Sequence, residues 1–153
     1  RYDSSKKKYV KIGSTKKLSY TNKKLKSGKK YTCMVKAYTK INGVVYRGKG
    51  VKFYASTNPV KVKSLKVSSS KAKTAALSWN KVANATGYEV YRATSKNGKY
   101  TKAATISKGK TVKYTNSKLK SGKTYFYKVR AVIKTDSGIF KGSFSDIKSV
   151  KVK

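Results

Sequence analysis

The sequence of 153 residues contains no histidine and only 4 acidic residues, against 40 lysines and arginines. Imidazoles and paired carboxylates carry out most general acid–base catalysis near neutral pH. The acids are scattered along the chain, and no two of them fall as a pair on facing strands of the pattern described below; they are Asp3, Glu89, Asp136 and Asp146. We therefore predict that the protein is not an enzyme and that it has no catalytic residues, metal site or cofactor.

Cysteine, proline and long apolar runs are almost as scarce. Cys33 is the only cysteine and Pro59 the only proline. A single cysteine excludes an intrachain disulfide and a cysteine-based metal cluster. No stretch approaches roughly 18 consecutive apolar residues, so we expect no membrane-spanning helix. The amino end has no signal-peptide pattern and is not methionine, and we expect the chain to begin inside a larger protein.

The abundant feature is positive charge, because the formal net charge is +36. All but four of the cations are lysines; the arginines are Arg1, Arg47, Arg92 and Arg130. Such a chain attracts polyanions, but a lysine ammonium is a hydrated point charge without the planar fork that reads guanines and phosphates. We expect diffuse, salt-sensitive attraction to an anionic polymer or glycan and no sequence-specific recognition of nucleic acid.

An internal repeat organises the sequence. Residues 114–131 (YTNSKLKSGKTYFYKVRA) repeat residues 20–37 (YTNKKLKSGKKYTCMVKA) at an offset of ninety-four residues, and twelve of the eighteen positions are identical. So close a repeat in so short a chain indicates two copies of one structural unit. The 13 tyrosines and the regular Val, Ile and Leu pattern argue against disorder, since they give each segment an apolar face to bury.

Both copies follow the two-residue period of β-strands. In the first copy the pattern predicts strands over residues 9–12, 18–21 and 29–38, and a last strand over 44–47 and 51–55 that is interrupted by glycines. Asn42-Gly43 predicts a tight hairpin turn. In the second copy it predicts seven strands, over residues 60–67, 73–81, 88–92, 100–106, 111–115, 123–133 and 144–152. Seven short strands without helical periodicity are typical of a β-sandwich.

Three separated motifs of the second copy carry a family resemblance. They are Leu77-Ser78-Trp79, the sequence GYEVYR over residues 87–92, and the spaced set Leu119, Gly122 and Tyr125. Together they resemble the fibronectin type III module in the form found in bacterial extracellular proteins. The resemblance implies an all-β, immunoglobulin-like sandwich, with the tryptophan packed against the third-strand tyrosine and Tyr125 in a tyrosine corner. The core residues expected from it are Leu77, Trp79, Tyr88, Val90, Leu119 and Tyr125, with Leu25 and Tyr31 in the first copy.

The first copy has no counterpart of the tryptophan or of GYEVYR. When Arg1 is aligned with Arg92 and Tyr9 with Tyr100, residues 58–91 of the second copy have no counterparts in the first. We therefore predict two tandem units, residues 1–57 as the C-terminal part of a fibronectin type III-like unit without its first strands and residues 58–153 as a complete domain. We expect the first unit to be completed by residues upstream of Arg1, by a second chain or by strand exchange. Cys33 is expected to be a buried, inert thiol, because it aligns with Tyr127 on the inward face.

Outward side chains are the candidates for ligand binding. Strand alternation directs Tyr91 and Phe126 away from the core, together with Lys128 and Arg130. Such a strip could stack a sugar or a base, or it could be cross-strand packing of surface aromatics. A second candidate is the lysine run Lys6, Lys7 and Lys8, which could grip an anionic polymer or form a solvated face. Glu89 is expected to point outward and to pair with a lysine, and Asp136 to serve a turn.

The resemblance implies a non-catalytic module of a bacterial extracellular or cell-surface protein, acting as a spacer and adhesive surface. Since a fold does not establish a function, two alternatives stay open. One is a dedicated module that binds a polyanion such as wall polymer, acidic glycan or nucleic acid. The other is an assembly subunit in which another protein or chain segment completes the first unit.

Overall fold

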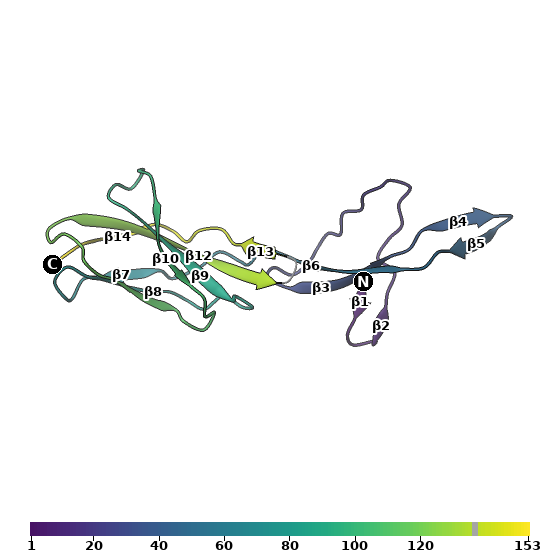
Figure 1. The fold of residues 1–153 in the computed structure, drawn as a ribbon, viewed down its shortest axis with the longest axis horizontal. Helices are drawn as coiled ribbons and strands as arrows, with labels where there is room; N and C mark the ends of the chain where they lie inside the picture. Colours follow the sequence, from purple (N-terminus) through teal and green to yellow (C-terminus); the bar gives the residue numbers. More distant parts are fainter. Residues whose placement is uncertain (136–137) are drawn as a thin grey trace. The chain divides into compact units, whose positions relative to one another are not determined.

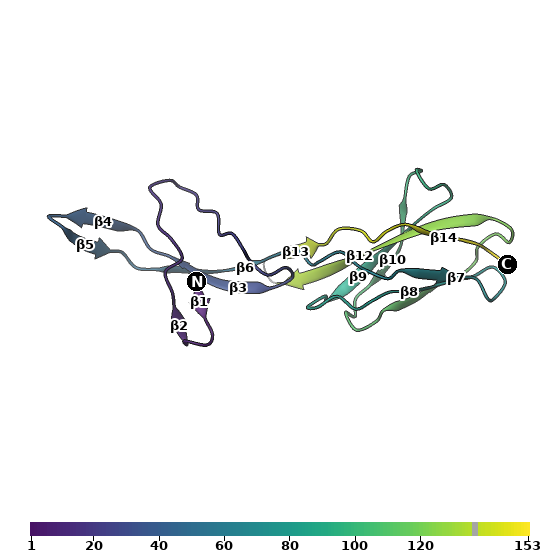
Figure 2. The same ribbon diagram turned by 180° about the vertical axis from the view of Figure 1, so that it is seen from behind.

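The computed structural model describes residues 1–135 and 138–153. The chain divides into two compact units, Arg1–Thr57 and Asn58–Lys153. Every regular element of the described residues is a β-strand (Figures 1 and 2). The predicted all-β class is confirmed.

The second unit consists of two antiparallel sheets. The larger sheet has the order β10 (Thr101–Ile106), β9 (Gly87–Ala93), β12 (Thr124–Thr135) and β13 (Gly138–Lys141), and β14 (Lys148–Lys151) also pairs with β12. The smaller sheet has the order β11 (Lys113–Asn116), β8 (Ala75–Ser78) and β7 (Lys66–Ser68). In Figure 2 the strands β7 and β8 of the smaller sheet are seen below β12 and β14 of the larger. This is the predicted immunoglobulin-like sandwich.

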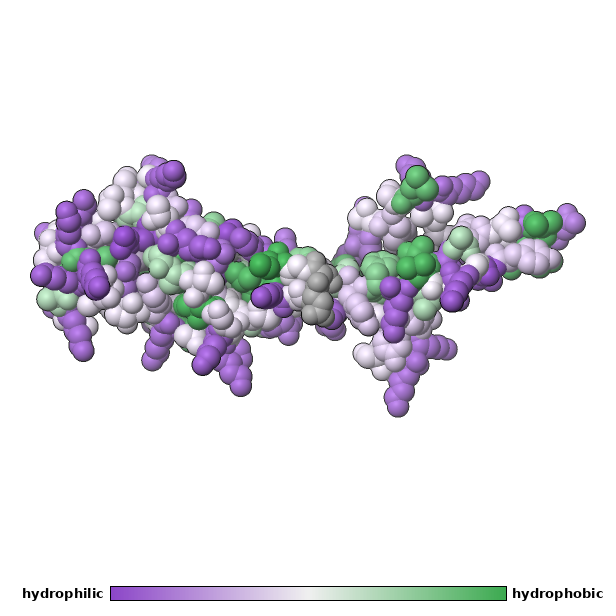
Figure 3. Space-filling model, viewed as in Figure 1, coloured by the Kyte–Doolittle hydropathy of each residue, from purple (hydrophilic) through white to green (hydrophobic). Residues whose placement is uncertain are grey.

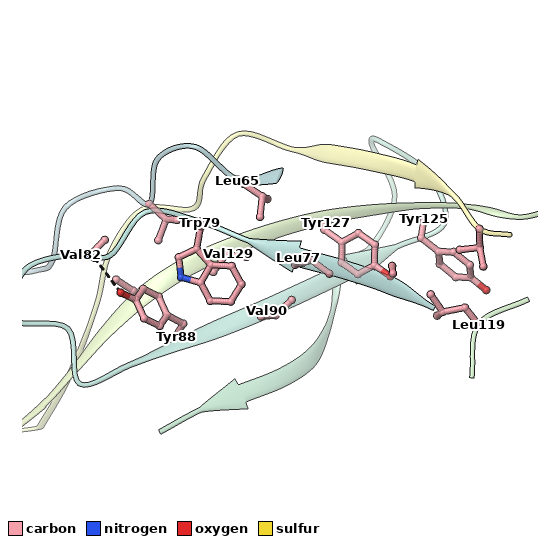
Figure 4. Packing of buried hydrophobic residues seen from close by; sticks show 14 residues of the cluster. Leu65, Leu77, Trp79, Val82, Tyr88, Val90, Leu119, Tyr125, Tyr127 and Val129 are labelled. Carbon is pink, nitrogen blue, oxygen red and sulfur yellow. Dashed lines mark hydrogen bonds between the residues drawn. The ribbon is translucent and has the colours of Figure 1, made fainter. Parts of the chain in front are cut away.

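The core of the second unit lies between these sheets. Trp79 packs edge-on against Tyr88, with ring centroids 5.3 Å apart. The Tyr88 hydroxyl accepts a hydrogen bond from the backbone N–H of Val82 at 3.0 Å (Figure 4), so the buried phenol has a partner. The other large members are aliphatic side chains and tyrosines from strands of both sheets and from segments outside the strands: Leu65, Leu77, Val90, Leu119, Tyr125, Tyr127 and Val129.

A tyrosine corner occurs in both units. The backbone N–H of Lys120 donates to the Tyr125 hydroxyl at 3.2 Å, and that of Lys26 donates to the Tyr31 hydroxyl at 2.8 Å. Gly122 precedes the strand in a left-handed conformation, with φ 76°, which glycine adopts without the strain of a Cβ. The repeat therefore encodes the same local turn twice.

The first unit contains three separate two-stranded ladders. They are β1 (Tyr2–Asp3) with β2 (Lys8–Tyr9), β3 (Lys30–Val35) with β6 (Val51–Ser56), and β4 (Tyr38–Ile41) with β5 (Val44–Arg47). The β4–β5 hairpin turns at Asn42 and Gly43, with φ values of 48° and 83°. Both angles are positive, as in the type I′ turn that Asn-Gly favours.

Several strand predictions are wrong. Residues 18–21 form no strand, and the last strand predicted for the first copy is two strands, β5 and β6, which pair with different partners. In the second unit only Lys66 and Val67 of the predicted strand 60–67 belong to a strand, β7, although Val62 and Leu65 are buried. The sequence also missed β13, which forms a hairpin with the end of β12.

The expected core of the first unit is also wrong. Leu25 and Tyr31 are half-buried rather than buried, and so is the Cys33 thiol. Val35 is 61% exposed, whereas its counterpart Val129 is fully buried. The physical reason is that no second sheet packs against β3 and β6 in the described residues, so their apolar side chains have no opposing layer.

Candidate functional site

The outer face of the larger sheet carries a cluster of cations, aromatic rings and one carboxylate, which we call the Arg130 cluster. On neighbouring strands β9 and β12, Glu89 pairs with Arg130 and Tyr91 pairs with Lys128. Strand alternation places these four side chains on the face away from the core. Tyr100, Phe144, Lys102 and Lys141 complete the cluster from adjacent segments.

Glu89 is the anionic centre of the Arg130 cluster and is only 6% exposed. Its carboxylate Oε2 accepts a hydrogen bond from Arg130 Nε at 2.7 Å and contacts Arg130 Nη2 at 2.7 Å. Lys141 and Lys102 approach the other oxygen at 3.5 and 3.6 Å. Burial alone would raise the pKa of Glu89, but the Arg130 hydrogen bond and the three positive charges outweigh it, so the pKa is lowered. Glu89 therefore stays ionised at neutral pH.

Aromatic rings contact two of the cations of the cluster, Arg130 and Lys128. The Arg130 guanidinium lies 4.7 Å from the Phe144 ring centre and 5.3 Å from that of Tyr91, and these two rings meet edge-on at 5.0 Å. Lys128 Nζ lies 4.2 Å from the Tyr100 ring centre and 4.5 Å from that of Phe144. These distances are in the range of cation–π attraction. The rings and cations are thus engaged with one another.

The structure brings together three of the four predicted strip residues, Tyr91, Lys128 and Arg130. Phe126 is half-buried on the same strand, and within the described residues no ring contact joins it to the cluster. Sequence reasoning missed Phe144 and Tyr100 as members, and it expected a lysine where Arg130 is the main partner of Glu89. The alternation of β9 does place Glu89 beside Tyr91, so the carboxylate could have been assigned to the strip.

The lysine run spans the end of the turn between β1 and β2 of the first unit and the first residue of β2, Lys8. Lys6, Lys7 and Lys8 are exposed. Asp3 Oδ1 accepts hydrogen bonds from the Ser5 hydroxyl at 2.6 Å and from the Ser5 and Lys6 backbone N–H groups. The Ser5 hydroxyl bond is the main cause that lowers the pKa of Asp3. The aspartate therefore shapes the turn that presents the lysines.

In the described residues no group of three or more His, Cys, Asp or Glu side chains could hold a metal ion. A surface hollow of about 520 Å³ lies over β7, β8 and β11, and it is lined by side chains such as Lys66, Ser78, Lys113 and Tyr114. Asp136 lies outside the described residues. No helix in the described part of the chain is long and apolar enough to cross a bilayer.

Comparison with known families decides the relationship. The model of the Fibronectin type III domain matches residues 59–143, more than half of the chain. The chain belongs to the fibronectin type III family. The match includes the tryptophan and GYEVYR motifs of the second unit. No curated protein sequence matches the chain.

Three of the solved structures that match the chain, each less than 25% identical to it, share its fold. The sixth such domain of human fibronectin type III domain containing protein 3 is 19% identical, with a TM-score of 0.51, covering 64% of this chain and 89% of that chain. A mutant designated FN3tt is 24% identical, with a TM-score of 0.50, covering 62% and 97%. Domains d3–d4 of the rat CD45 extracellular region are 17% identical, with a TM-score of 0.55, covering 94% and 74%.

Proposed function

We propose that this chain is a non-catalytic spacer and adhesive module of a bacterial extracellular or cell-surface protein, and that its lysine surface attracts anionic polymers. Fibronectin type III domains generally serve as non-catalytic spacers or interaction modules and are common in extracellular and surface proteins. The resemblance of the motifs to the bacterial form of the module supports the bacterial assignment. We further propose that residues 1–57 are the C-terminal part of a second such unit.

The observation that carries this proposal is the unbalanced charge on a folded sandwich. Only 4 acidic residues face 40 lysines and arginines, so most cations have no carboxylate to pair with. Glu89 is already buried under Arg130, and Asp146 is bound to Lys61 at 2.6 Å. Hydrophilic side chains project over the visible surface of both units (Figure 3). The resulting field attracts polyanions regardless of their sequence.

The same charge favours the alternative of a dedicated polyanion-binding module. The two functions differ in how binding responds to salt and to local neutralisation. On a diffuse surface, any exposed lysine can pair with a phosphate or sulfate of the polymer. Replacing any three exposed lysines should therefore weaken binding by the same small amount. A dedicated site depends on particular cations. The Arg130 cluster is a weaker candidate for such a site, because a ligand would have to displace its internal contacts.

The test measures binding of the full chain to dextran sulfate and to polyglutamate between low and physiological salt. Weak attraction to both polymers that disappears as salt rises is the expected result. A triple variant K6S/K7S/K8S is compared with K108S/K110S/K113S, which neutralises three exposed lysines of the second unit. Equal, small losses support a diffuse adhesive surface.

Two results would overturn the proposal in favour of the alternative. One is saturable binding to a single polymer that survives physiological salt. The other is a large loss of affinity in only one of the triple variants, since that would locate a site. Absence of any binding at low salt would remove adhesion and leave the spacer role alone.

A further inference from the structure

The strand pairing at the amino end of the first unit reproduces the end of strand β9 in the second. Val10 N–H donates to Arg1 O at 2.9 Å, and the Arg1 amino nitrogen donates to Val10 O at 2.9 Å. The counterpart pair in the second unit is Arg92 with Thr101. The Arg1 guanidinium lies 5.3 Å from the Tyr31 ring centre, as the Arg92 guanidinium does from Tyr125. Arg1 therefore occupies the position of Arg92.

Strand β9 begins five residues before Arg92, whereas its first-unit counterpart segment begins at Arg1, the equivalent of Arg92. In the second unit β9 runs beside β12 and pairs with it from Phe126 to Val132. In the first unit β3 forms a ladder with β6 alone among the described residues, and only the short β1 lies near its other edge. The edge of β3 beyond Arg1 is thus the place of a missing strand.

A second segment lacks the same neighbours. The residues of β11 correspond to residues 19–22, which contain the same Tyr-Thr-Asn sequence. Strand β11 pairs with β8 in the smaller sheet. Residues 19–22 are irregular, and Tyr20 is 49% exposed. Both defects have one cause, because β8 and residues 87–91 of β9 belong to the stretch 58–91 that has no counterpart in the first unit.

The uncovered face is apolar at the positions that the second unit buries. Tyr125, Tyr127, Val129 and Ala131 are all buried in β12. Their counterparts Tyr31 and Cys33 are half-buried, and Val35 and Ala37 are exposed. Exposed apolar patches of this kind mark surfaces that another segment covers.

We propose that the first unit is an acceptor for one segment, a three-stranded stretch of the type of residues 58–91, joined to the amino nitrogen of Arg1. Its last strand lies antiparallel along β3 and continues the ladder that Arg1 already makes with Val10. Its middle strand pairs with residues 19–22, and its apolar side chains cover the face that contains Cys33.

A second copy of this chain is the poorer occupant for two reasons. Each copy carries a net charge of +36, so two copies repel each other at moderate salt. A copy that donated β7, β8 and β9 would also have to expose its own Trp79 and Tyr88, which are 4% and 0% exposed. A segment joined covalently to Arg1 avoids both the repulsion between two copies and the exposure of a donor's core.

The test joins a copy of residues 58–91 directly in front of Arg1 of the full chain, which keeps the register of the repeat. Cys33 is the single cysteine, so the rate of maleimide labelling reports how well this face is covered. We expect labelling to slow by about a hundredfold or more relative to the parent chain, because Cys33 then reacts only after local unfolding. A fusion with a scrambled segment of the same composition should label like the parent.

A second variant separates covering of the face from any general effect of the added segment. In the fusion, V35K places a charge in the covered layer and should restore rapid labelling. Equal labelling of the true and scrambled fusions would overturn the proposal, as would protection that persists in V35K. Protection of Cys33 in the parent chain that grows with concentration and accompanies dimer formation would overturn it in favour of a second copy. None of these readouts depends on polyanion binding.

Discussion

Glu89 is the residue whose surroundings differ most from what its place in the sequence suggests. Strand alternation correctly directs it away from the core, yet the side chain is only 6% exposed because Arg130, Lys102 and Lys141 close over it. Those partners come from three different strands, and only the assembled sheet brings them together. A sequence read segment by segment shows the alternation but not which cation reaches the carboxylate.

The lowered pKa of Glu89 predicts an acid-dependent loss of stability. Since the folded-state pKa lies below the ordinary value of 4.5, the stabilisation is complete above that pH and is lost as pH falls through the folded-state value. We expect E89Q to lower the free energy of unfolding at pH 7 by about 1–3 kcal/mol and to flatten the dependence below pH 4.5. Urea titrations of both proteins from pH 7 to pH 3 measure this. An unchanged acid profile in E89Q would contradict the assignment.

Tyr127 predicts a loss of stability as pH rises, in contrast to the loss at low pH expected for Glu89. Burial raises its pKa to about 12, and Asn116 Nδ2 donates to its hydroxyl at 3.1 Å. An unfolded tyrosine ionises near pH 10, so the native state should lose stability between about pH 10 and 12 as only the unfolded chain releases this proton. The difference between wild type and Y127F, followed by urea titration, isolates this contribution from the lysines. A pH-independent difference over that range would contradict the assignment.

At the scale of elements, a strand forms only where a partner strand exists. Residues 20–22 and 114–116 have the same sequence, Tyr-Thr-Asn, but only the second copy is a strand. The alternating pattern correctly predicted most strands of the second unit, the Asn-Gly hairpin and the sandwich class. It failed at residues 18–21, because pairing depends on β8, which lies far away in sequence and has no counterpart in the first unit.

The same contrast makes a prediction for matched core positions. Val129 is fully buried and its counterpart Val35 is 61% exposed. We expect V129A to cost about 2 kcal/mol of unfolding free energy, since it removes buried methyl groups and leaves a cavity, and V35A to change stability by less than about 0.5 kcal/mol. Urea unfolding followed by circular dichroism compares them. Equal costs would mean that β3 has a covering layer.

At the scale of the whole molecule, the described residues form a sandwich of two sheets in the second unit and three two-stranded ladders in the first, under a strong positive charge. The family resemblance was readable from the sequence because its motifs are local: Leu77-Ser78-Trp79, GYEVYR and the tyrosine corner. The composition of the Arg130 cluster was readable only in part, since Phe144 and Tyr100 reach it from segments outside the pattern of β9 and β12. The partner of the surface is not encoded in any of these motifs.

The central claim is that the second unit holds its own core while the first has none, and one measurement tests it directly. Trp79 is the single tryptophan and lies in the second unit, and Cys33 is the single cysteine and lies in the first. In a urea titration we follow Trp79 fluorescence and Cys33 labelling in the same sample. The account predicts that Cys33 labels without urea nearly as fast as in the unfolded chain, while Trp79 reports a cooperative transition at higher urea. Protection of Cys33 that is lost together with the Trp79 transition would contradict it.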